Sequence, residues 1–396
     1  MSGVAGYTRR TMTATLESAA TIQDLVRDAV ESRTPLRIAG RSHWIDAGRP
    51  VDATRIASLA SHSGVVDYVP GDLTITVRSG TTLSEIERVT GAEGQWLPLD
   101  PHGSGDGTIG ATIATGSFGP LAHAFGRARD LVLGLEFVSG DGRVIRGGGR
   151  VVKNVAGFDL TRLLTGSWGT LGIITEATLR LYSRPRTSLT VAMSVPDGSQ
   201  KLAERLAAIL DAPVTPYTVE LVSAAAALRL GLPARPTALV ELGGNAASVV
   251  AQRGSLSRLG GMVELPASLR SSIRSLDADR NGHQPIVLRL SSLPARLAEI
   301  WTTATERLTI VEGVYLHATP SVGIVRCIVP ASADSELVTS LVSNLPGVTV
   351  VYERLTPDLW NVLSPSVVSD RLSAGMRDVF DPHRILNPGI LGGLAS

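Results

Sequence analysis

Residues 99–120 read Leu-Asp-Pro-His-Gly-Ser-Gly-Asp-Gly-Thr-Ile-Gly-Ala-Thr-Ile-Ala-Thr-Gly-Ser-Phe-Gly-Pro. Within this stretch, residues 105–110 fit the pattern G-x-G-x-x-G, which indicates a Rossmann dinucleotide site when a strand precedes it and a helix follows. Pro98 and Pro101 occupy the place where that strand would have to be, so the context argues against a Rossmann unit. We therefore interpret the stretch as a long loop, whose glycines allow the main chain to approach a ligand closely.

This loop offers the groups that hold a pyrophosphate without lysines. Its backbone amides are numerous, and hydroxyl donors are available from Thr108, Thr112, Thr115 and Ser117. Residues 39–43, Ala-Gly-Arg-Ser-His, follow a predicted strand and form a second candidate phosphate site, with Arg41 or Ser42 as donors. The alternatives are a flexible surface loop for the first segment and an ordinary turn for the second.

Composition excludes several classes of protein. The 396 residues suggest two or three domains, and 43% hydrophobic with only 18% charged residues argues against disorder. Lys+Arg is 37 and Asp+Glu is 36, so the net charge of +1 lacks the basic surplus of a nucleic-acid binder. The single cysteine, Cys327, excludes a disulfide framework, an iron–sulfur cluster or a cysteine-based zinc site within this chain.

The chain also lacks the signatures of membrane insertion and export. No apolar run reaches the roughly 18 residues that a membrane-spanning helix needs. Residues 1–10 have no apolar core of the kind found in signal peptides. We therefore expect a cytoplasmic protein with no direct membrane insertion, associated with a membrane only through partner subunits.

Hydrophobic periodicity divides the chain into three parts. Residues 13–33 predict a helix that Thr15 or Ser18 can cap, and shorter strands and helices follow up to 181. Arg184-Pro185-Arg186 marks a boundary, beyond which strand and helix patterns alternate in a way that predicts a mainly antiparallel sheet. Residues 369–380 predict a last helix. We expect domains over 1–185 and 186–368, with 369–396 returning to the first.

Four blocks occur in order along the chain: Arg37–His43, Leu99–Pro120, Lys153–Leu181 and Asp381–Gly389. The third block reads Lys-Asn-Val-Ala-Gly-Phe-Asp-Leu-Thr-Arg-Leu-Leu-Thr-Gly-Ser-Trp-Gly-Thr-Leu-Gly-Ile-Ile-Thr-Glu-Ala from residue 153 to 177. Together the blocks resemble the vanillyl-alcohol oxidase superfamily, whose FAD domain is of the PCMH type. The third block is typical of the branch that oxidises 2-hydroxy acids, and the last block narrows the resemblance to the flavin subunits of bacterial glycolate oxidases.

The resemblance implies an α+β fold, in which a PCMH-type FAD-binding domain of two α/β subdomains carries an α+β cap with a mainly antiparallel sheet. It also implies which residues contact FAD. The resemblance and the two glycine-bearing segments together assign cofactor binding to Ala39, Gly40, Arg41, Ser42, His43, Pro101, Gly105, Gly107, Thr108, Ile109, Gly110, Ile113, Ala114, Gly116, Ser117, Gly166, Gly169, Gly172, Ile173, Ile174 and Asn387. Relatives that attach FAD through histidine carry it after a Gly-Gly pair, where this chain has Arg41, so we expect non-covalent FAD.

Three residues are candidates for substrate chemistry. Hydride transfer from a hydroxy acid needs a base for the hydroxyl proton and a cation for the carboxylate. Many relatives carry His-x-Gly-Asp-Gly-Asn-x-His in the cap, whereas this chain has His317 and then Ile324 in place of the second histidine, so we expect no metal site of that type. We assign His317 as the base, with Lys153 and Arg289 as carboxylate ligands. The alternatives are a hydrogen-bonded strand histidine, a solvated lysine and a structural ion pair.

The resemblance implies an FAD-dependent oxidoreductase acting on CH–OH groups. We expect this chain to be a subunit of a 2-hydroxy-acid dehydrogenase, in which a hydride passes from the substrate α-carbon to flavin N5. Electrons would continue to an iron–sulfur partner and a quinone, and a larger flavin subunit would complete the complex. The alternatives are a self-sufficient FAD oxidase or dehydrogenase of a hydroxy acid or alcohol, and a non-catalytic assembly subunit with structural FAD.

Overall fold

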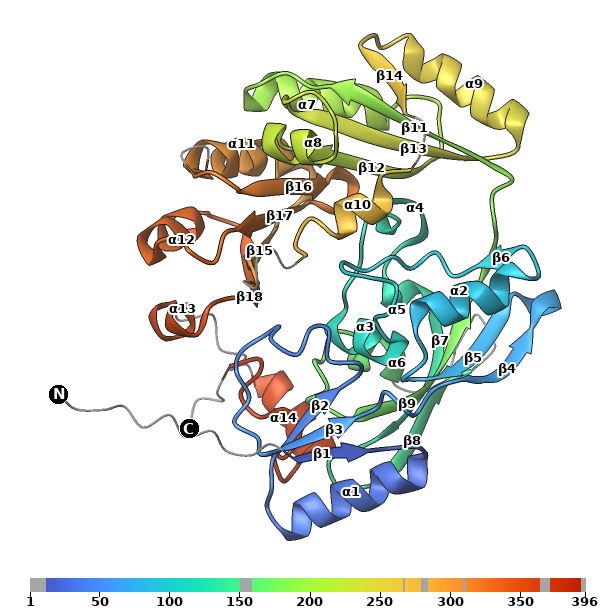
Figure 1. The fold of residues 1–396 in the computed structure, drawn as a ribbon, viewed down its shortest axis with the longest axis vertical. Coiled ribbons are helices and arrows are strands. Elements are labelled where there is room, and N and C mark those ends of the chain that lie inside the picture. The colour runs from blue at the N-terminus through green and yellow to red at the C-terminus, as the bar shows by residue number, and fades with distance from the viewer. Residues whose placement is uncertain are drawn as a thin grey trace.

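The computed structural model describes residues 12–149, 159–265, 268–278, 284–308, 311–363 and 371–392. Figure 1 shows two lobes, one built from the N-terminal elements together with α14 (Arg371–Phe380) and the other from β11 onward. Among the described helices, none has the length and apolar character that crossing a bilayer requires. The fold is α+β, as the sequence predicts.

A small parallel sheet opens the first lobe. Its strands run in the order β1–β3–β2, and helix α1 (Ala19–Glu31) packs against it. The bounds of the strands are Met12–Thr15 for β1, Leu36–Ala39 for β2 and Arg55–Ser58 for β3. Ser18 caps α1, and the buried face of Ile22, Val26 and Ala29 joins a core with Leu36. This packing fixes the end of β2, from which the first glycine turn departs.

The second sheet of this lobe is antiparallel, with the order β4–β5–β9–β7–β8. Its bounds are Val65–Val69 (β4), Thr74–Arg78 (β5), Val132–Val138 (β7), Val144–Gly148 (β8) and Ile173–Arg180 (β9). The neighbouring helices are α2 (Leu83–Gly91), α4 (Ala122–Phe125), α5 (Ala128–Leu131) and α6 (Leu160–Leu164). Thr82 caps α2, as its spacing to Glu85 predicts.

The glycine-rich stretch is not a continuous loop, contrary to the expectation. Helix α3 (Ile109–Thr115) begins after the N-cap Thr108 and ends at Gly116, whose φ of 63° suits a C-cap glycine. Its glycine and threonines are weak helix formers, so the sequence did not predict a helix here. The Rossmann reading is still excluded, because the only described strand just upstream is the two-residue β6 (Gln95–Trp96), antiparallel to β10 (Tyr182–Ser183).

The second lobe is built on one sheet, antiparallel throughout its described pairings, with the order β14–β11–β13–β12–β16–β17–β15–β18. The strands are Thr187–Ser194 (β11), Pro216–Val222 (β12), Thr237–Gly244 (β13), Met262–Leu265 (β14), Ile286–Ser291 (β15), Tyr315–Thr319 (β16), Ile324–Val329 (β17) and Thr349–Arg354 (β18). The helices are Ser199–Leu210 (α7), Ala224–Arg229 (α8), Ala246–Ser257 (α9), Arg270–Arg274 (α10), Leu297–Leu308 (α11), Ser335–Val342 (α12) and Pro357–Val362 (α13). We propose that this cap begins at the link between β10 and β11, near residue 186.

Alternation along the central cap strands separates two faces. Leu288, Leu290, Val325 and Cys327 belong to the large apolar core that includes residues of α7 and α11. The residues between them, Arg289 and Arg326, point to the other face, because successive side chains of a strand alternate. That other face carries the polar groups described below.

The C-terminal tail returns to the first lobe after α14. Leu386 forms a parallel bridge with Leu36 of β2. The buried Asp381 carboxylate accepts hydrogen bonds from the amides of Ile385 and Leu386, both at 3.1 Å. These contacts bring Asn387 beside β2, although about 350 residues separate the two in sequence.

Candidate active site

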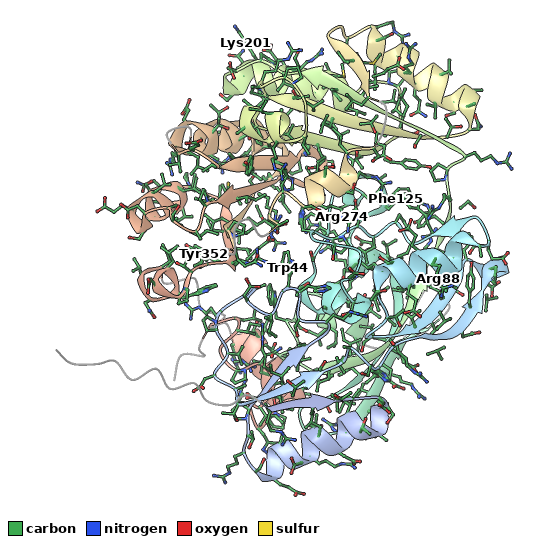
Figure 2. All side chains as sticks on the ribbon, viewed as in Figure 1. Trp44, Arg88, Phe125, Lys201, Arg274 and Tyr352 are labelled. Atoms are coloured by element: carbon green, nitrogen blue, oxygen red, sulfur yellow. The ribbon has the colours of Figure 1, made fainter. Side chains whose placement is uncertain are left out.

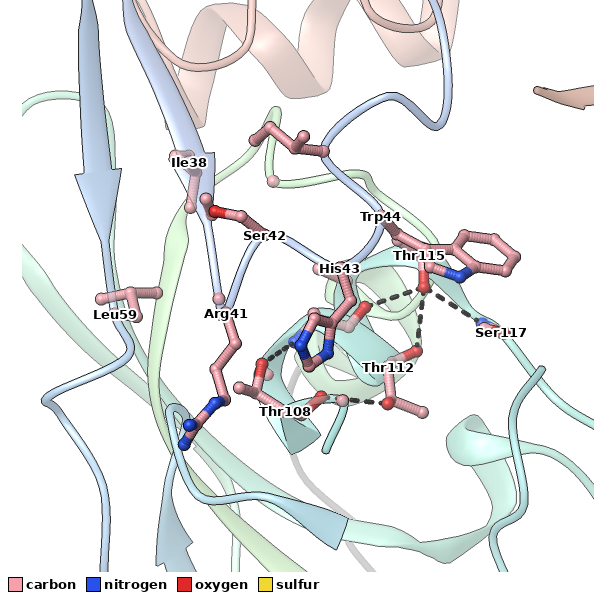
Figure 3. Close-up of a pocket in the computed structure, with 18 of the residues that line it drawn as sticks. Ile38, Arg41, Ser42, His43, Trp44, Leu59, Thr108, Thr112, Thr115 and Ser117 are labelled. Atoms are coloured by element: carbon pink, nitrogen blue, oxygen red, sulfur yellow. Dashed lines mark hydrogen bonds between the residues drawn. The ribbon is translucent and has the colours of Figure 1, made fainter. Parts of the chain in front are cut away.

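A large cavity opens in the first lobe, with about 1040 Å³ of free space, part of it continuous with solvent. It lies among the end of β2, helix α3, the 168–172 turn and the C-terminal tail (Figure 3). Fifteen of the residues assigned to FAD line it: Ala39, Gly40, Arg41, Ser42, His43, Pro101, Gly107, Thr108, Gly110, Ala114, Ser117, Gly169, Gly172, Ile174 and Asn387. Segments far apart in sequence therefore meet at one cavity.

The turn after β2 has the geometry of an anion site. Ser42 has a φ of 63°, a left-handed conformation that is unusual for serine. No hydrogen bond is recorded from the amides of Arg41, Ser42 and His43 in the described structure. Successive free amides around a left-handed residue form a concave nest for a phosphate group. The segment therefore fits a pyrophosphate of the cofactor.

The threonine hydroxyls of α3 are used differently from the expectation. Thr112 donates to the carbonyl of Thr108 at 3.0 Å, and Thr115 donates to that of Ala111 at 2.8 Å. Thr108 accepts from the Ala111 amide as the helix cap. Two of the four predicted hydroxyl donors are thus committed to the helix, and the fit to a pyrophosphate depends chiefly on main-chain amides.

Asn387 joins three segments at the floor of the cavity. Its Oδ1 accepts from the Ile38 amide at 2.8 Å, and its Nδ2 donates to the Trp168 carbonyl at 2.7 Å. Its own amide donates to Leu36 at 3.0 Å. Asn387 and Trp168 have φ values of 42° and 55°, so these bonds hold two residues in strained conformations at the cavity wall.

Close main-chain packing shows why glycine is required beside the cavity. A Cβ on Gly110 would lie 2.6 Å from Cβ and 2.9 Å from the carbonyl oxygen of Ser79. A Cβ on Gly172 would lie 2.5 Å from the Phe137 ring. Both distances are below normal carbon contacts, so any side chain there would displace the wall.

Six of the residues assigned to FAD do not line this cavity. Ile109 and Ile113 are fully buried in the core under the five-stranded sheet, and Ile173 is buried in the core of the small sheet. Gly105 packs against Ser84, and Gly116 packs against the backbone of Gly166. Gly166 itself lines a different cavity beside α14. These residues pack around the cavity and do not line it.

A second, smaller cavity adjoins the first, with about 300 Å³ of free space, part of it continuous with solvent. His102 and Ser117 line both cavities, and the cap supplies most of the remaining wall. His317, Arg326 and Arg289 stand in register on the neighbouring strands β16, β17 and β15. Two glutamates extend this line, Glu220 from β12 and Glu353 from β18, and we call these five side chains the polar row.

The arginines of the polar row differ in how they are paired. Arg326 is 1% exposed and donates to Glu353 at 2.8 Å and to Asp277 at 2.7 Å. Its Nη1 has no partner among the described residues. Arg289 is only loosely paired, with Nη1 3.6 Å from Glu353 and Nε without a described partner. Buried cations without full pairing are suited to bind a carboxylate.

His317 is held at one end of the row. Its Nδ1 lies 3.1 Å from Oε2 of Glu220, and Nε2 has no partner in the described structure. Burial, reinforced by Arg326, lowers the pKa of His317 to about 3, so the imidazole is neutral at ordinary pH. A neutral imidazole facing a cavity is suited to accept a proton.

His102 enters from the first lobe and was not singled out from the sequence. Its ring centroid is 5.1 Å from that of His317, and its Nδ1 has no described partner. Burial and the cations around it lower the pKa of His102 well below the usual histidine value. The cap clamps the preceding turn, since Arg274 donates to Pro101 at 2.6 Å (Figure 2).

One predicted residue cannot be placed, and several residues around the smaller cavity were not predicted. Lys153 lies outside the described residues. Thr319, Glu220 and Arg326 carry no local signature, and only the register of the cap strands could have brought them together. Phe118 lies in the first lobe just after α3 and lines the smaller cavity from that side. Trp44, whose ring lies 5.7 Å from the Arg326 guanidinium, follows the predicted phosphate turn and could have been added to it.

Parts of the chain are similar to known proteins. A family model described as an FAD binding domain matches residues 11–148. The chain is 40% identical over 182 residues to glycolate oxidase subunit GlcE of Escherichia coli, which covers 45% of this chain and 52% of that protein. It is 32% identical over 223 residues to glycolate oxidase subunit GlcD of Bacillus subtilis, covering 54% and 47%. The chain spans about half the length of these curated relatives.

Solved structures support the fold over nearly the whole chain. p-Cresol methylhydroxylase superposes with a TM-score of 0.74 at 16% identity, covering 96% of this chain and 88% of that one. Alkyldihydroxyacetonephosphate synthase gives 0.71 at 17% identity, covering 95% and 75%. The overall fold is thus that of p-cresol methylhydroxylase and alkyldihydroxyacetonephosphate synthase. Within it, residues 11–148 are similar to the FAD binding domain family.

Proposed function

We propose that this chain is an FAD-dependent dehydrogenase subunit that oxidises a small 2-hydroxy acid. The observation that carries the proposal is the meeting of two unlike cavities at His102 and Ser117. One is walled by glycines and free amides that suit a dinucleotide, and the other by arginines and histidines that suit a hydroxy acid. The names of the relatives, which include glycolate oxidase subunits and a probable D-lactate dehydrogenase of Danio rerio, support the same chemistry.

FAD, when bound, supplies an acceptor for the hydride at flavin N5. The free amides of the 41–43 turn would hold its pyrophosphate, and the glycine at position 110, whose own amide donates to Ser79, would let the chain approach it closely. Asn387 and Ile174 would lie along the rest of the cavity. Arg289, with Nη1 of Arg326, would bind the substrate carboxylate. His317 Nε2 would accept the hydroxyl proton as the α-hydrogen leaves.

We further propose that the electrons leave through partner chains. The sequence contains one cysteine, so an iron–sulfur cluster would have to belong to another subunit. A larger flavin subunit would complete a complex of the glycolate-oxidase type. Co-purification of the tagged chain with such subunits after co-expression tests this, and isolation of a chain that turns over with an artificial acceptor and binds neither favours a self-sufficient enzyme.

The function itself is tested by anaerobic spectroscopy. The FAD-loaded chain is mixed with glycolate, D-lactate or, as a control, acetate, which has the carboxylate but no hydroxyl. Bleaching of the flavin absorbance by a hydroxy acid alone is the expected result. A flavin that dithionite reduces but no hydroxy acid reduces would contradict the proposal and favour an assembly or relay role.

A further inference from the structure

His317 is the last member of a buried chain of three hydrogen-bonded side chains. The Thr319 hydroxyl hydrogen-bonds to Oε1 of Glu220, and Oε2 of the same carboxyl lies 3.1 Å from His317 Nδ1. All three residues are buried, with Glu220 at 0% exposure. Strands β12 and β16 pair directly, with Leu221 opposite Ala318 and Val222 opposite His317. This pairing keeps Glu220 on β12 close to both His317 and Thr319 on β16. This arrangement leaves His317 no freedom to rotate away.

The position of one proton in this chain decides what His317 can do. If the Glu220 carboxylate is ionised, Nδ1–H donates to it and Nε2 presents a lone pair toward the smaller cavity. If Glu220 carries the proton, it donates to Nδ1, and Nε2 must carry a hydrogen. Only the first arrangement can accept a proton from a substrate hydroxyl.

We infer that Glu220 is a positioning residue that keeps the imidazole proton of His317 on Nδ1 and so leaves Nε2 free to act as the base. This inference rests on the proposed function. The hydroxyl proton would move to Nε2, the α-hydrogen would leave with its electron pair to the flavin, and a 2-oxo acid would remain. The Glu220 carboxylate would then stabilise the imidazolium until its proton returns to solvent.

The surroundings of the pair give the mechanism a pH dependence. Burial raises the pKa of Glu220 well above its usual value, the Thr319 hydrogen bond opposes this, and Asp100 adds to it. Arg326, Asp277 and His102 face His317. Because Glu220 ionises above the usual glutamate range, the accepting form of His317 becomes more populated as pH rises. The rate of flavin reduction should therefore increase with pH through the Glu220 ionisation.

Glu220→Gln tests the inference with little change in shape. The glutamine carbonyl can accept from Thr319 while its amide donates to Nδ1, which forces hydrogen onto Nε2. Long-range proton–nitrogen NMR of protein labelled with ¹⁵N-histidine reports the tautomer without substrate, and His317→Asn identifies the signals. We expect an Nδ1–H tautomer in the wild type at pH 8 and an Nε2–H tautomer in Glu220→Gln. An Nε2–H tautomer in the wild type at that pH would overturn the inference.

Kinetics provide the second readout. We expect Glu220→Gln to reduce the rate of flavin reduction by roughly 100- to 10,000-fold, which is the usual contribution of a positioned base. The increase of this rate with pH should also disappear. Glu241→Gln is the matched control, since Glu241 is another buried glutamate of the same sheet but pairs with Arg270 outside the polar row. An unchanged rate in Glu220→Gln with full FAD content would also overturn the inference.

Thr319→Val covers the case in which Glu220→Gln does not fold. Loss of the Thr319 hydrogen bond raises the pKa of Glu220 further. The rise of the flavin-reduction rate should therefore occur at higher pH, and the rate reached at the highest pH should be similar to that of the wild type. A rise at the wild-type pH would contradict the role of Glu220. If no hydroxy acid reduces the wild-type flavin, the proposed function fails, whereas the tautomer measurement still decides the role of Glu220.

Discussion

The two cavities are built from different materials. The larger one, in the first lobe, is walled by glycines, free amides and main-chain carbonyls, with strained backbone at Ser42, Trp168 and Asn387. The smaller one, in the cap, is walled by buried ionic side chains of the polar row. A site made of backbone depends on close packing of the chain, whereas a site made of charges depends on the ion pairs that hold its side chains in place. The two should therefore fail in different ways when mutated.

The largest expected effect breaks the charged cavity. Arg326→Met leaves Asp277 and Glu353 buried without their cation, which should cost about 3–5 kcal/mol of unfolding free energy. Urea unfolding of the FAD-loaded protein measures it. Arg162→Met is the control, because Arg162 forms an exposed ion pair with Asp159 whose loss should cost under about 1 kcal/mol. Equal stability of the two variants would show that the polar row is not a paired network.

A second prediction concerns the buried Asp100, whose Oδ1 accepts from the Leu121 amide. Burial raises its pKa to about 7, and Oδ2 has no described partner. Because the folded state binds this proton more tightly than the unfolded state, stability should fall as pH rises from about 4 to about 7, by at most about 4 kcal/mol. Asp100→Asn should remove that dependence and be more stable than the wild type at pH 8. The same change in unfolding free energy between pH 5 and pH 8 in Asp100→Asn and in the wild type would contradict this prediction.

The third prediction breaks the backbone cavity. Gly110→Ala forces a Cβ against Ser79, so the wall must move at a cost of about 1–3 kcal/mol, with FAD affinity reduced by roughly 5- to 150-fold. Gly107→Ala is a close control in the same cavity, since its Cβ would meet only Ser104 at an ordinary 3.6 Å. Fluorescence titration with FAD separates the two. Similar affinities would mean that close packing at Gly110 does not shape the cavity.

The smallest effect is expected at an ion pair between the lobes whose carboxylate is partly exposed and whose arginine is buried. Asp46, in the turn after the phosphate nest, lies 2.8 Å from Nε of Arg354 in the cap, and its side chain is 38% exposed. Asp46→Asn should lower the free energy of unfolding by only about 0.2–1 kcal/mol. This difference from the wild type should become smaller as the salt concentration rises. A loss as large as that of Arg326→Met would show that the lobes are held together mainly by this contact.

The same difference explains what the sequence could reveal. The backbone cavity leaves local signs in the sequence, because its glycines, hydroxyls and turns are contiguous. Residues 39–43, Gly107, Thr108 and Gly110, all predicted to bind the cofactor, line the cavity. Ile109 and Ile113 share that motif but face the core, since a seven-residue helix replaced the expected loop. The polar row is spread from Glu220 to Glu353 with no regular spacing, and only strand register aligns it. His317 and Arg289 were predicted, whereas Glu220 and Arg326 were not.

The central claim is that the first cavity binds FAD while the second handles the substrate. The most direct test is the anaerobic rate of flavin reduction by D-lactate or glycolate in His317→Asn, compared with the wild type at equal FAD occupancy. We predict unchanged FAD affinity and a rate lower by roughly 100- to 10,000-fold, because the variant loses the base that faces the second cavity. A wild-type rate in His317→Asn, or loss of FAD from a folded variant, would contradict the division between the two cavities.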